Sequence, residues 1–211
     1  MQSYWERETL RHFDLIVVGG GIVGHSTALF YAESHPNARI AILERGLFPE
    51  GASTKNAGFA CFGSIAELEH DLASLGAQRT VELVLKRFSG LQLLRQALGD
   101  QAIDYHEVGG YELCFEAPDL ERINFFNDLL EPALGARPYS VVQNNGFGFS
   151  DSVHSMIKNA LEGTIDTGKM MAALQRKVAQ LGVQTFTQSA VATIEDGPHG
   201  KLVCVETTSG P

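Results

Sequence analysis

The sequence predicts an α/β protein in which buried strands alternate with helices. An apolar, β-branched segment at residues 13–18 is followed at once by a glycine-rich turn and a helical pattern, and a second apolar strand comes after that helix. Apolar residues then recur at helical spacing from 65 to 98. From residue 103 onward, short strand-like segments alternate with helical ones.

Composition limits the class of protein and its partners. The chain has 211 residues, of which 44% are apolar, so it can form a real core in one or two domains. Its net charge is 16 − 25 = −9, which argues against nucleic acid or an anionic membrane as a partner. No segment is apolar enough to span a bilayer, and the first residues lack the pattern of a secretion signal.

Cysteine and histidine usage gives no sign of a disulfide framework or a metal site. The three cysteines (Cys61, Cys114 and Cys204) are odd in number and widely spaced, and the seven histidines form no metal-binding motif. We therefore expect a reducing, cytoplasmic location and no bound metal.

The most informative segment is a strand, glycine turn, helix and strand near the start of the chain. Residues 13–18 predict the first strand, and Gly-Gly-Gly-Ile-Val-Gly at 19–24 fits the pattern G-x-G-x-x-G. Residues 25–33 predict a helix that stops before Pro36, and residues 39–43 predict a second strand that ends in Glu44.

Each part of this unit suits a dinucleotide. Gly19 permits the tight turn, Gly21 permits close approach of a pyrophosphate, and Gly24 permits close packing of helix on sheet. The helix N-terminus then faces the phosphates. Glu44 lies 20 residues after Gly24, a spacing that places its carboxylate at a ribose diol. A strand-to-helix turn without a ligand is the alternative.

The choice of dinucleotide depends on Glu44 and on the loop that follows it. A carboxylate at this position disfavours the 2′-phosphate of NADP, even with Arg45 beside it, whereas NAD and FAD both carry the free diol. Residues 46–59 form a long segment rich in glycine and hydroxyl groups, where a simple NAD domain would begin its next helix. Such a segment favours a second wrap around the pyrophosphate and flavin of FAD.

The same residues resemble the start of the D-amino-acid oxidase (glycine oxidase-like, DAO) family of FAD-dependent oxidoreductases. The resemblance is carried by GGGIVG at 19–24, LERG at 43–46 and GASTKNAGF at 51–59. It implies a Rossmann-like FAD-binding domain interrupted by an α+β substrate domain. It implies that Ile22 and Val23 contact FAD at the glycine turn, that Glu44 and Arg45 contact the ribose, and that Ala52 and Ser53 contact the pyrophosphate. It also implies that residues 56–59 lie near the isoalloxazine and that Val191 meets the adenine. With the motif glycines, the expected cofactor-binding residues are Gly19, Gly20, Gly21, Ile22, Val23, Gly24, Glu44, Arg45, Ala52, Ser53, Asn56, Ala57, Gly58, Phe59 and Val191.

The rest of the chain predicts further elements. Helices fill 65–98 with stops at Gly76 and Gly99, a strand with an internal Gly-Gly covers 105–115, and a helix starts at Pro118-Asp119 and runs to Leu130. Asn-Asn-Gly at 144–146 predicts a hairpin turn between 140–143 and 147–149. A helix at 169–181, capped by Asp166 or Thr167, precedes strands at 183–186, 190–194 and 202–207, which are antiparallel in the family.

We therefore expect the FAD-binding domain at 1–99, a substrate-domain portion at 100–159, and a return to the FAD-binding domain at 160–211. Family members continue well beyond this point, so we expect an amino-terminal fragment whose carboxyl-terminal part is absent and which is inactive alone.

The expected activity is FAD-dependent oxidation of the C–N bond of an amino acid or secondary amine. No catalytic residue can be named, because the resemblance places those residues beyond Pro211. The partner is a small-molecule amine, and the oligomeric state is not predicted. An NAD-dependent dehydrogenase and a non-catalytic dinucleotide-binding remnant are the alternatives. We interpret His25 as a partly buried helix residue and Cys61 as a small loop residue, and Tyr105 and His106 as strand residues within reach of a substrate pocket.

Overall fold

The structure, a computed structural model, describes residues 3–142, 147–150, 152–198 and 200–206. The contacts divide the chain into two compact units. Unit 1 combines Met1–Ala57 with Thr167–Pro211, and unit 2 is Gly58–Asp166. None of the helices in these described ranges is long and apolar enough to cross a membrane.

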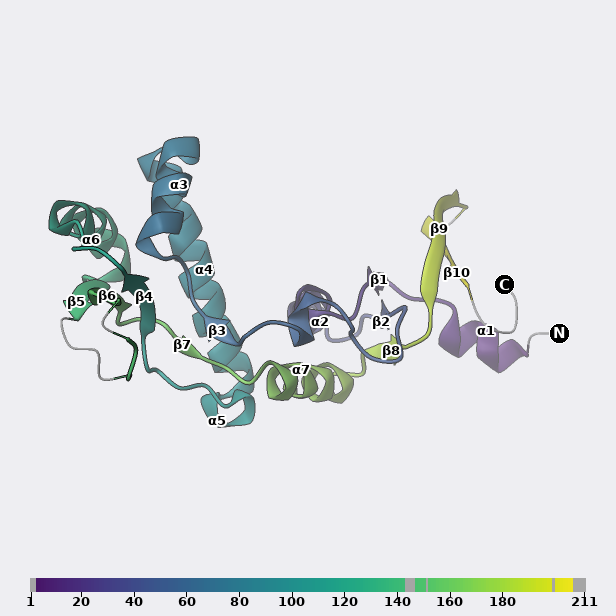
Figure 1. Ribbon diagram of the computed structural model, residues 1–211. Coiled ribbons are helices and arrows are strands. Elements are labelled where there is room, and N and C mark those ends of the chain that lie inside the picture. Colours follow the sequence, from purple (N-terminus) through teal and green to yellow (C-terminus); the bar gives the residue numbers. More distant parts are fainter. Residues whose placement is uncertain (1–2, 143–146, 151, 199, 207–211) are drawn as a thin grey trace. The chain divides into compact units, whose positions relative to one another are not determined.

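Unit 1 is built on a three-stranded parallel sheet (Figure 1). Its elements in chain order are α1 (Tyr4–Leu10), β1 (Leu15–Val18), α2 (Ile22–Ser34), β2 (Ile40–Leu43), the 3₁₀ turn η1 (Ala52–Thr54), α7 (Thr167–Gln180), β8 (Gln184–Phe186), β9 (Ala190–Gly197) and β10 (Gly200–Glu206). The strand order is β1-β2-β8, with Leu15 opposite Ile40 and Leu43 opposite Phe186. β2 is the middle strand and lies between β1 and β8, and its residues Ile40, Ala41 and Ile42 are buried.

The strands after α7 differ from the antiparallel arrangement that we expected. β8 runs parallel to β2, because α7 returns the chain so that β8 enters the sheet in the same direction as β1 and β2. α7 packs against α2 through its apolar face, which includes Met171, Leu174 and Val178. β9 and β10 do form an antiparallel hairpin, separate from the parallel sheet.

Unit 2 combines helices with two small antiparallel sheets (Figure 1). Its elements are β3 (Phe59–Ala60), α3 (Ile65–Leu75), α4 (Ala77–Leu98), α5 (Asp100–Ile103), β4 (Gly110–Cys114), α6 (Leu120–Leu134), β5 (Tyr139–Val142), β6 (Ser155–Asn159) and β7 (Gly163–Thr164). The larger sheet has the order β4-β6-β5, and β3 pairs with β7. One apolar cluster joins α3, α4, α6 and this sheet, and its buried members are Phe62, Ile65, Leu68, Val84, Ile123, Phe126, Leu130, Tyr139 and Ile157.

This shared core explains why the units divide at 57/58 and 166/167, whereas we expected boundaries at 99/100 and 159/160. Leu68 on α3 and Val84 on α4 pack with Phe126 on α6, so residues 58–99 belong with the segment that follows them. The helices themselves begin and end close to where the sequence predicts. Gly76, at φ +79°, separates α3 from α4.

Three elements of unit 2 differ from expectation. The strand expected at 105–115 is shortened to β4 (Gly110–Cys114), so its Gly-Gly lies at the start of the strand and not inside it. α6 is capped by Asp119 as predicted but continues past Leu130 and through Pro132, and Gly135 in the left-handed conformation ends it. Strand β5 pairs with β6, and residues 147–149 are not a strand. The predicted turn at 144–146 lies outside the described residues.

Candidate dinucleotide site

The glycine turn of unit 1 connects β1 to α2 as the motif predicts. Gly19 has φ +101°, a conformation that favours glycine, and its N–H donates to Leu43 O at 2.8 Å, which joins the turn to β2. α2 begins at Ile22, with Gly21 as an N-cap that supplies no side-chain cap. Gly21 therefore leaves the backbone N–H groups of the first helical turn to partners from elsewhere, and a helix N-terminus suits an anionic ligand.

A side chain on any of three motif glycines would crowd its neighbours, most severely at Gly24. A Cβ atom on Gly24 would lie 1.9 Å from Gly19 O and 3.3 Å from Val17 Cγ1. A Cβ on Gly20 would lie 3.1 Å from the Glu44 side chain, and one on Gly21 would lie 2.9 Å from Ser53 Oγ. The helix backbone thus lies directly against the turn at Gly24, and the side chains of Glu44 and Ser53 lie against the turn at Gly20 and Gly21.

Glu44 is held rigidly at the end of β2. Its side chain is 8% exposed, its Oε2 accepts the Gly20 N–H at 2.8 Å, and its Oε1 accepts the Gly46 N–H at 2.8 Å. A carboxylate has about four lone-pair positions, so each oxygen can accept one more hydrogen bond. That remaining capacity matches the two hydroxyls of a ribose diol, and its negative charge would repel a 2′-phosphate.

Ser53 links the long loop to the start of α2. Its Oγ accepts the Ile22 N–H at 2.9 Å, which leaves its own hydroxyl proton to donate to a phosphate oxygen. Ser53 lies in η1, which packs against α7. The Asn56 amide donates to Ala52 O at 2.9 Å and to Ser53 O at 3.3 Å, so Asn56 stabilises the turn that carries Ser53.

The segment before β9 lies beside Glu44. Gln188 N–H donates to Gly46 O at 2.9 Å, and Ser189 N–H donates to Glu44 O at 2.9 Å. Val191 follows two residues later and is half-buried in β9, opposite Val205. The structure therefore brings together, within unit 1, the glycine turn, Glu44, η1 and the start of β9. Arg45 is exposed next to Glu44.

The remaining predicted contacts are divided between the two units. Ala57 is exposed at the end of the first segment of unit 1. Gly58 and Phe59 belong to unit 2, where Gly58 has φ +77° and its carbonyl accepts the Ile165 N–H at 2.8 Å. Phe59 is 73% exposed on β3, so its ring is accessible for stacking.

His25 is fully buried on α2. Its Nδ1 lies 3.3 Å from Gly21 O, and its Nε2 has no hydrogen-bond partner among the described residues. Burial lowers the pKa of this imidazole, and nearby backbone carbonyls and Glu44 partly oppose that shift. His25 is a helix residue as expected, but it is fully buried and not partly buried.

The other candidates lie in unit 2. Cys61 is exposed and lines a cavity of about 490 Å³ in unit 2, together with Glu67, Glu112 and Glu162. Tyr105 is buried with its ring 4.1 Å from the Arg95 guanidinium carbon, and His106 is exposed and 2.9 Å from Asp104 Oδ1. Neither Tyr105 nor His106 lines that cavity.

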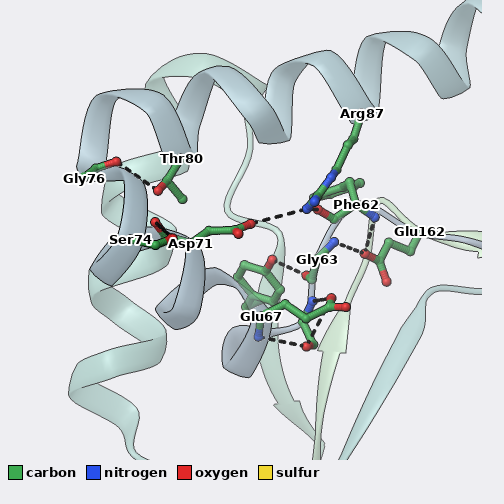
Figure 2. Close-up of polar contacts among 11 residues, drawn as sticks. Phe62, Gly63, Glu67, Asp71, Ser74, Gly76, Thr80, Arg87 and Glu162 are labelled. Atoms are coloured by element: carbon green, nitrogen blue, oxygen red, sulfur yellow. Dashed lines mark hydrogen bonds and ion pairs between the residues drawn. The ribbon is translucent and has the colours of Figure 1, made fainter.

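Sequence reasoning missed two sets of contacts. The bonds from Gln188 and Ser189 to the backbone after β2 had no local signal, because they join segments more than 140 residues apart. Glu162 is buried, and its Oε1 accepts the N–H groups of Phe62 at 2.9 Å and Gly63 at 3.3 Å (Figure 2). Nothing in the residues next to Glu162 indicates this contact.

Comparison with known proteins assigns the chain to a family over nearly its whole length. Residues 14–211 match the DAO family, described as FAD dependent oxidoreductase. Glycine oxidase of Bacillus subtilis (strain 168) is 26% identical over 212 residues, covering 95% of this chain and 51% of the relative.

Solved structures share the fold. Glycine oxidase from Bacillus cereus ATCC 14579 has 23% identity and a TM-score of 0.62, covering 94% of this chain and 54% of that one. L-amino acid deaminase from Proteus vulgaris has 19% identity and a TM-score of 0.66, covering 95% and 45%. The chain thus spans about half the length of the relatives that it matches.

Proposed function

The chain belongs to the DAO family of FAD-dependent oxidoreductases, and we propose that it forms the cofactor-binding part of an enzyme that oxidises the C–N bond of an amino acid or a secondary amine. FAD supplies the redox chemistry when bound, by accepting a hydride from the carbon next to nitrogen. The chain's own residues bind and orient the cofactor and keep water from it.

The observation that carries the cofactor assignment is the joint geometry of Glu44, Ser53 and the start of α2. Glu44 would accept hydrogen bonds from the ribose hydroxyls, and Ser53 together with the N–H groups of the first helical turn would bind the pyrophosphate. Val191 would contact the adenine, and Asn56, Ala57, Gly58 and Phe59 would line the isoalloxazine. The NAD-dependent alternative is not favoured, since the family is FAD-dependent.

The substrate class is supported by the relatives. Glycine oxidase and L-amino acid deaminase both act, by name, on amino acids. A remnant without catalytic activity would still bind FAD but would not transfer a hydride to it, so a substrate test separates the two possibilities.

The test is anaerobic reduction of the flavin in the full-length protein. Glycine and N-methylglycine are the primary and secondary amine probes, and glycolate is a matched control with a hydroxyl in place of the amine. We expect an amine to bleach the visible flavin absorption and glycolate to leave it unchanged. Bleaching by glycolate alone, or by none of a full panel of amino acids and secondary amines, would contradict the proposed activity.

A further inference from the structure

His25 is a polar side chain on the otherwise apolar buried face of α2. It is fully buried, and the residues buried with it on this helix are Gly24, Ala28, Leu29 and Ala32, which carry no polar side-chain atoms. Burial of an imidazole costs free energy unless its polar atoms are hydrogen-bonded. The contacts that His25 makes therefore indicate what it does in the helix.

The partner of His25 is the carbonyl group of the N-cap residue. Its Nδ1 lies 3.3 Å from Gly21 O, and the same oxygen accepts the His25 backbone N–H at 3.0 Å. A carbonyl oxygen has two acceptor positions, so it can accept both bonds. The side chain thus adds a second bond to the carbonyl group at which α2 begins.

At neutral pH the imidazole is uncharged, and the geometry requires its proton on Nδ1. Burial lowers its pKa below the ordinary 6.5, and the carbonyls of Gly21 and Gly20 and the charge of Glu44 oppose this shift only in part. A neutral imidazole has a single N–H group. An unprotonated Nδ1 would face the lone pairs of Gly21 O, whereas a protonated Nδ1 donates to them.

The other end of the same peptide group reaches Ser53. Gly21 O and the Ile22 N–H belong to one trans peptide group, in which the C=O and N–H bonds point in opposite directions. The Ile22 N–H donates to Ser53 Oγ at 2.9 Å. A chain of hydrogen bonds therefore runs from His25 Nδ1 through this peptide group to Ser53. Bonds in such a chain polarise one another, so a donor on Gly21 O strengthens the Ile22 N–H as a donor.

We propose that His25 is a positioning residue for the pyrophosphate of FAD. Its Nδ1–H holds the peptide group between Gly21 and Ile22 in the orientation that presents the Ile22 N–H to Ser53 Oγ. That bond occupies an acceptor position of the hydroxyl and directs its proton toward the phosphate oxygen. The inference rests on the proposed function, because it needs the pyrophosphate beside Ser53.

His35 provides a comparison within the same helix. Its Nδ1 lies 3.2 Å from Tyr31 O, also four residues earlier, so it makes the same local contact as His25. His35 is exposed at the C-cap of α2, at the end of the helix away from the glycine turn. The local contact is common to both histidines, and the continuation to Ser53 distinguishes His25.

The test measures the affinity of the purified full-length protein, freed of flavin, for FAD by the change in flavin fluorescence. His25→Asn places an amide nitrogen at the position of Nδ1, His25→Gln places it one bond further out at the position of Nε2, and His25→Leu has no donor. We expect His25→Leu and His25→Gln to weaken FAD binding about tenfold, and His25→Asn to remain within about threefold of the unaltered protein. His35→Leu is the matched control and should leave FAD binding unchanged.

A double-mutant cycle separates positioning from a general structural role. Ser53→Ala removes the hydroxyl group and should weaken FAD binding about tenfold. Adding His25→Leu to Ser53→Ala should cause no further loss, because both changes remove the same phosphate contact. Independent effects would instead multiply to about a hundredfold. Circular dichroism of each flavin-free variant verifies that it is folded.

A second measurement does not depend on flavin. Long-range nitrogen–proton NMR correlations distinguish a proton on Nδ1 from one on Nε2, and the signal that His25→Asn removes belongs to His25. We expect the Nδ1–H form in the flavin-free protein. The Nε2–H form, equal losses in His25→Asn and His25→Gln, or multiplied losses in the double variant would overturn this inference and leave the FAD assignment intact. An unaltered protein that binds no FAD would overturn the proposed function as well.

Discussion

At the scale of single residues, Gly24 carries the greatest steric constraint in unit 1. Its missing side chain lets α2 approach the turn so closely that a Cβ atom would overlap Gly19 O. The same close approach lets the Ile22 N–H reach Ser53 Oγ and the Gly20 N–H reach Glu44 Oε2. A side chain added at Gly24 should therefore disturb the hydrogen bonds of both Ser53 and Glu44, which the proposed site needs.

Gly24→Ala should destabilise unit 1 by about 1–3 kcal/mol, because the added methyl group must displace backbone rather than a flexible side chain. It should also weaken FAD binding. Gly90→Ala in α4 is the matched control, since Gly90 is helical and has no atom within 4 Å of the added methyl group. That change should be neutral or stabilising by up to about 1 kcal/mol. Urea unfolding followed by circular dichroism measures both, and equal effects at the two positions would contradict the steric account.

His25 adds a pH dependence to the same helix. Burial holds its pKa below the ordinary 6.5, so at mildly acidic pH the unfolded chain binds a proton that the folded chain does not. Stability should therefore fall as the pH drops below about 6.5 and be retained above it. His25→Leu should reduce this dependence, and His35→Gln, at an exposed position, should not. Urea unfolding at several pH values checks it, and an unchanged dependence in His25→Leu would exclude His25 as its source.

At the scale of elements, local signals predicted most of the helices, whereas α1 and α5 were not predicted. Ser64 and Glu67 form a capping box at the start of α3, Gly76 and Gly99 bound α4, and Asp119 caps α6. These boundaries depend on residues within a few positions of each helix end, so the sequence contains the information. The end of α6 was not predicted, because the proline near its last turn does not interrupt the helix.

The strands were harder to predict because pairing is a property of distant segments. β6 is the central strand of its sheet, yet it contains Ser155, Lys158 and Asn159 and lacks a clear alternation. Its burial comes from β4 and β5 on either side. Likewise, the parallel pairing of β8 with β2 joins segments about 140 residues apart, which no local pattern specifies.

At the scale of the whole molecule, the chain consists of a split unit that carries the candidate dinucleotide site and an inserted unit with its own core. The glycine motif and Glu44 could be predicted from sequence because their spacing is fixed by one local strand-helix-strand unit. The carboxylate-lined cavity of unit 2 could not, since Glu67, Glu112 and Glu162 are brought together only by the fold. The division between the two units at 57/58 has the same origin, because α3 and α4 pack with residues that follow them.

The measurement that tests the central claim most directly is the visible absorption spectrum of the purified protein, followed by identification of the nucleotide released on heating. We predict a flavin spectrum and released FAD, with an occupancy that falls about tenfold at limiting FAD in Glu44→Gln, which loses the charge at the ribose. Release of NAD in place of FAD, or a colourless full-length protein purified in the presence of excess FAD, would contradict the account.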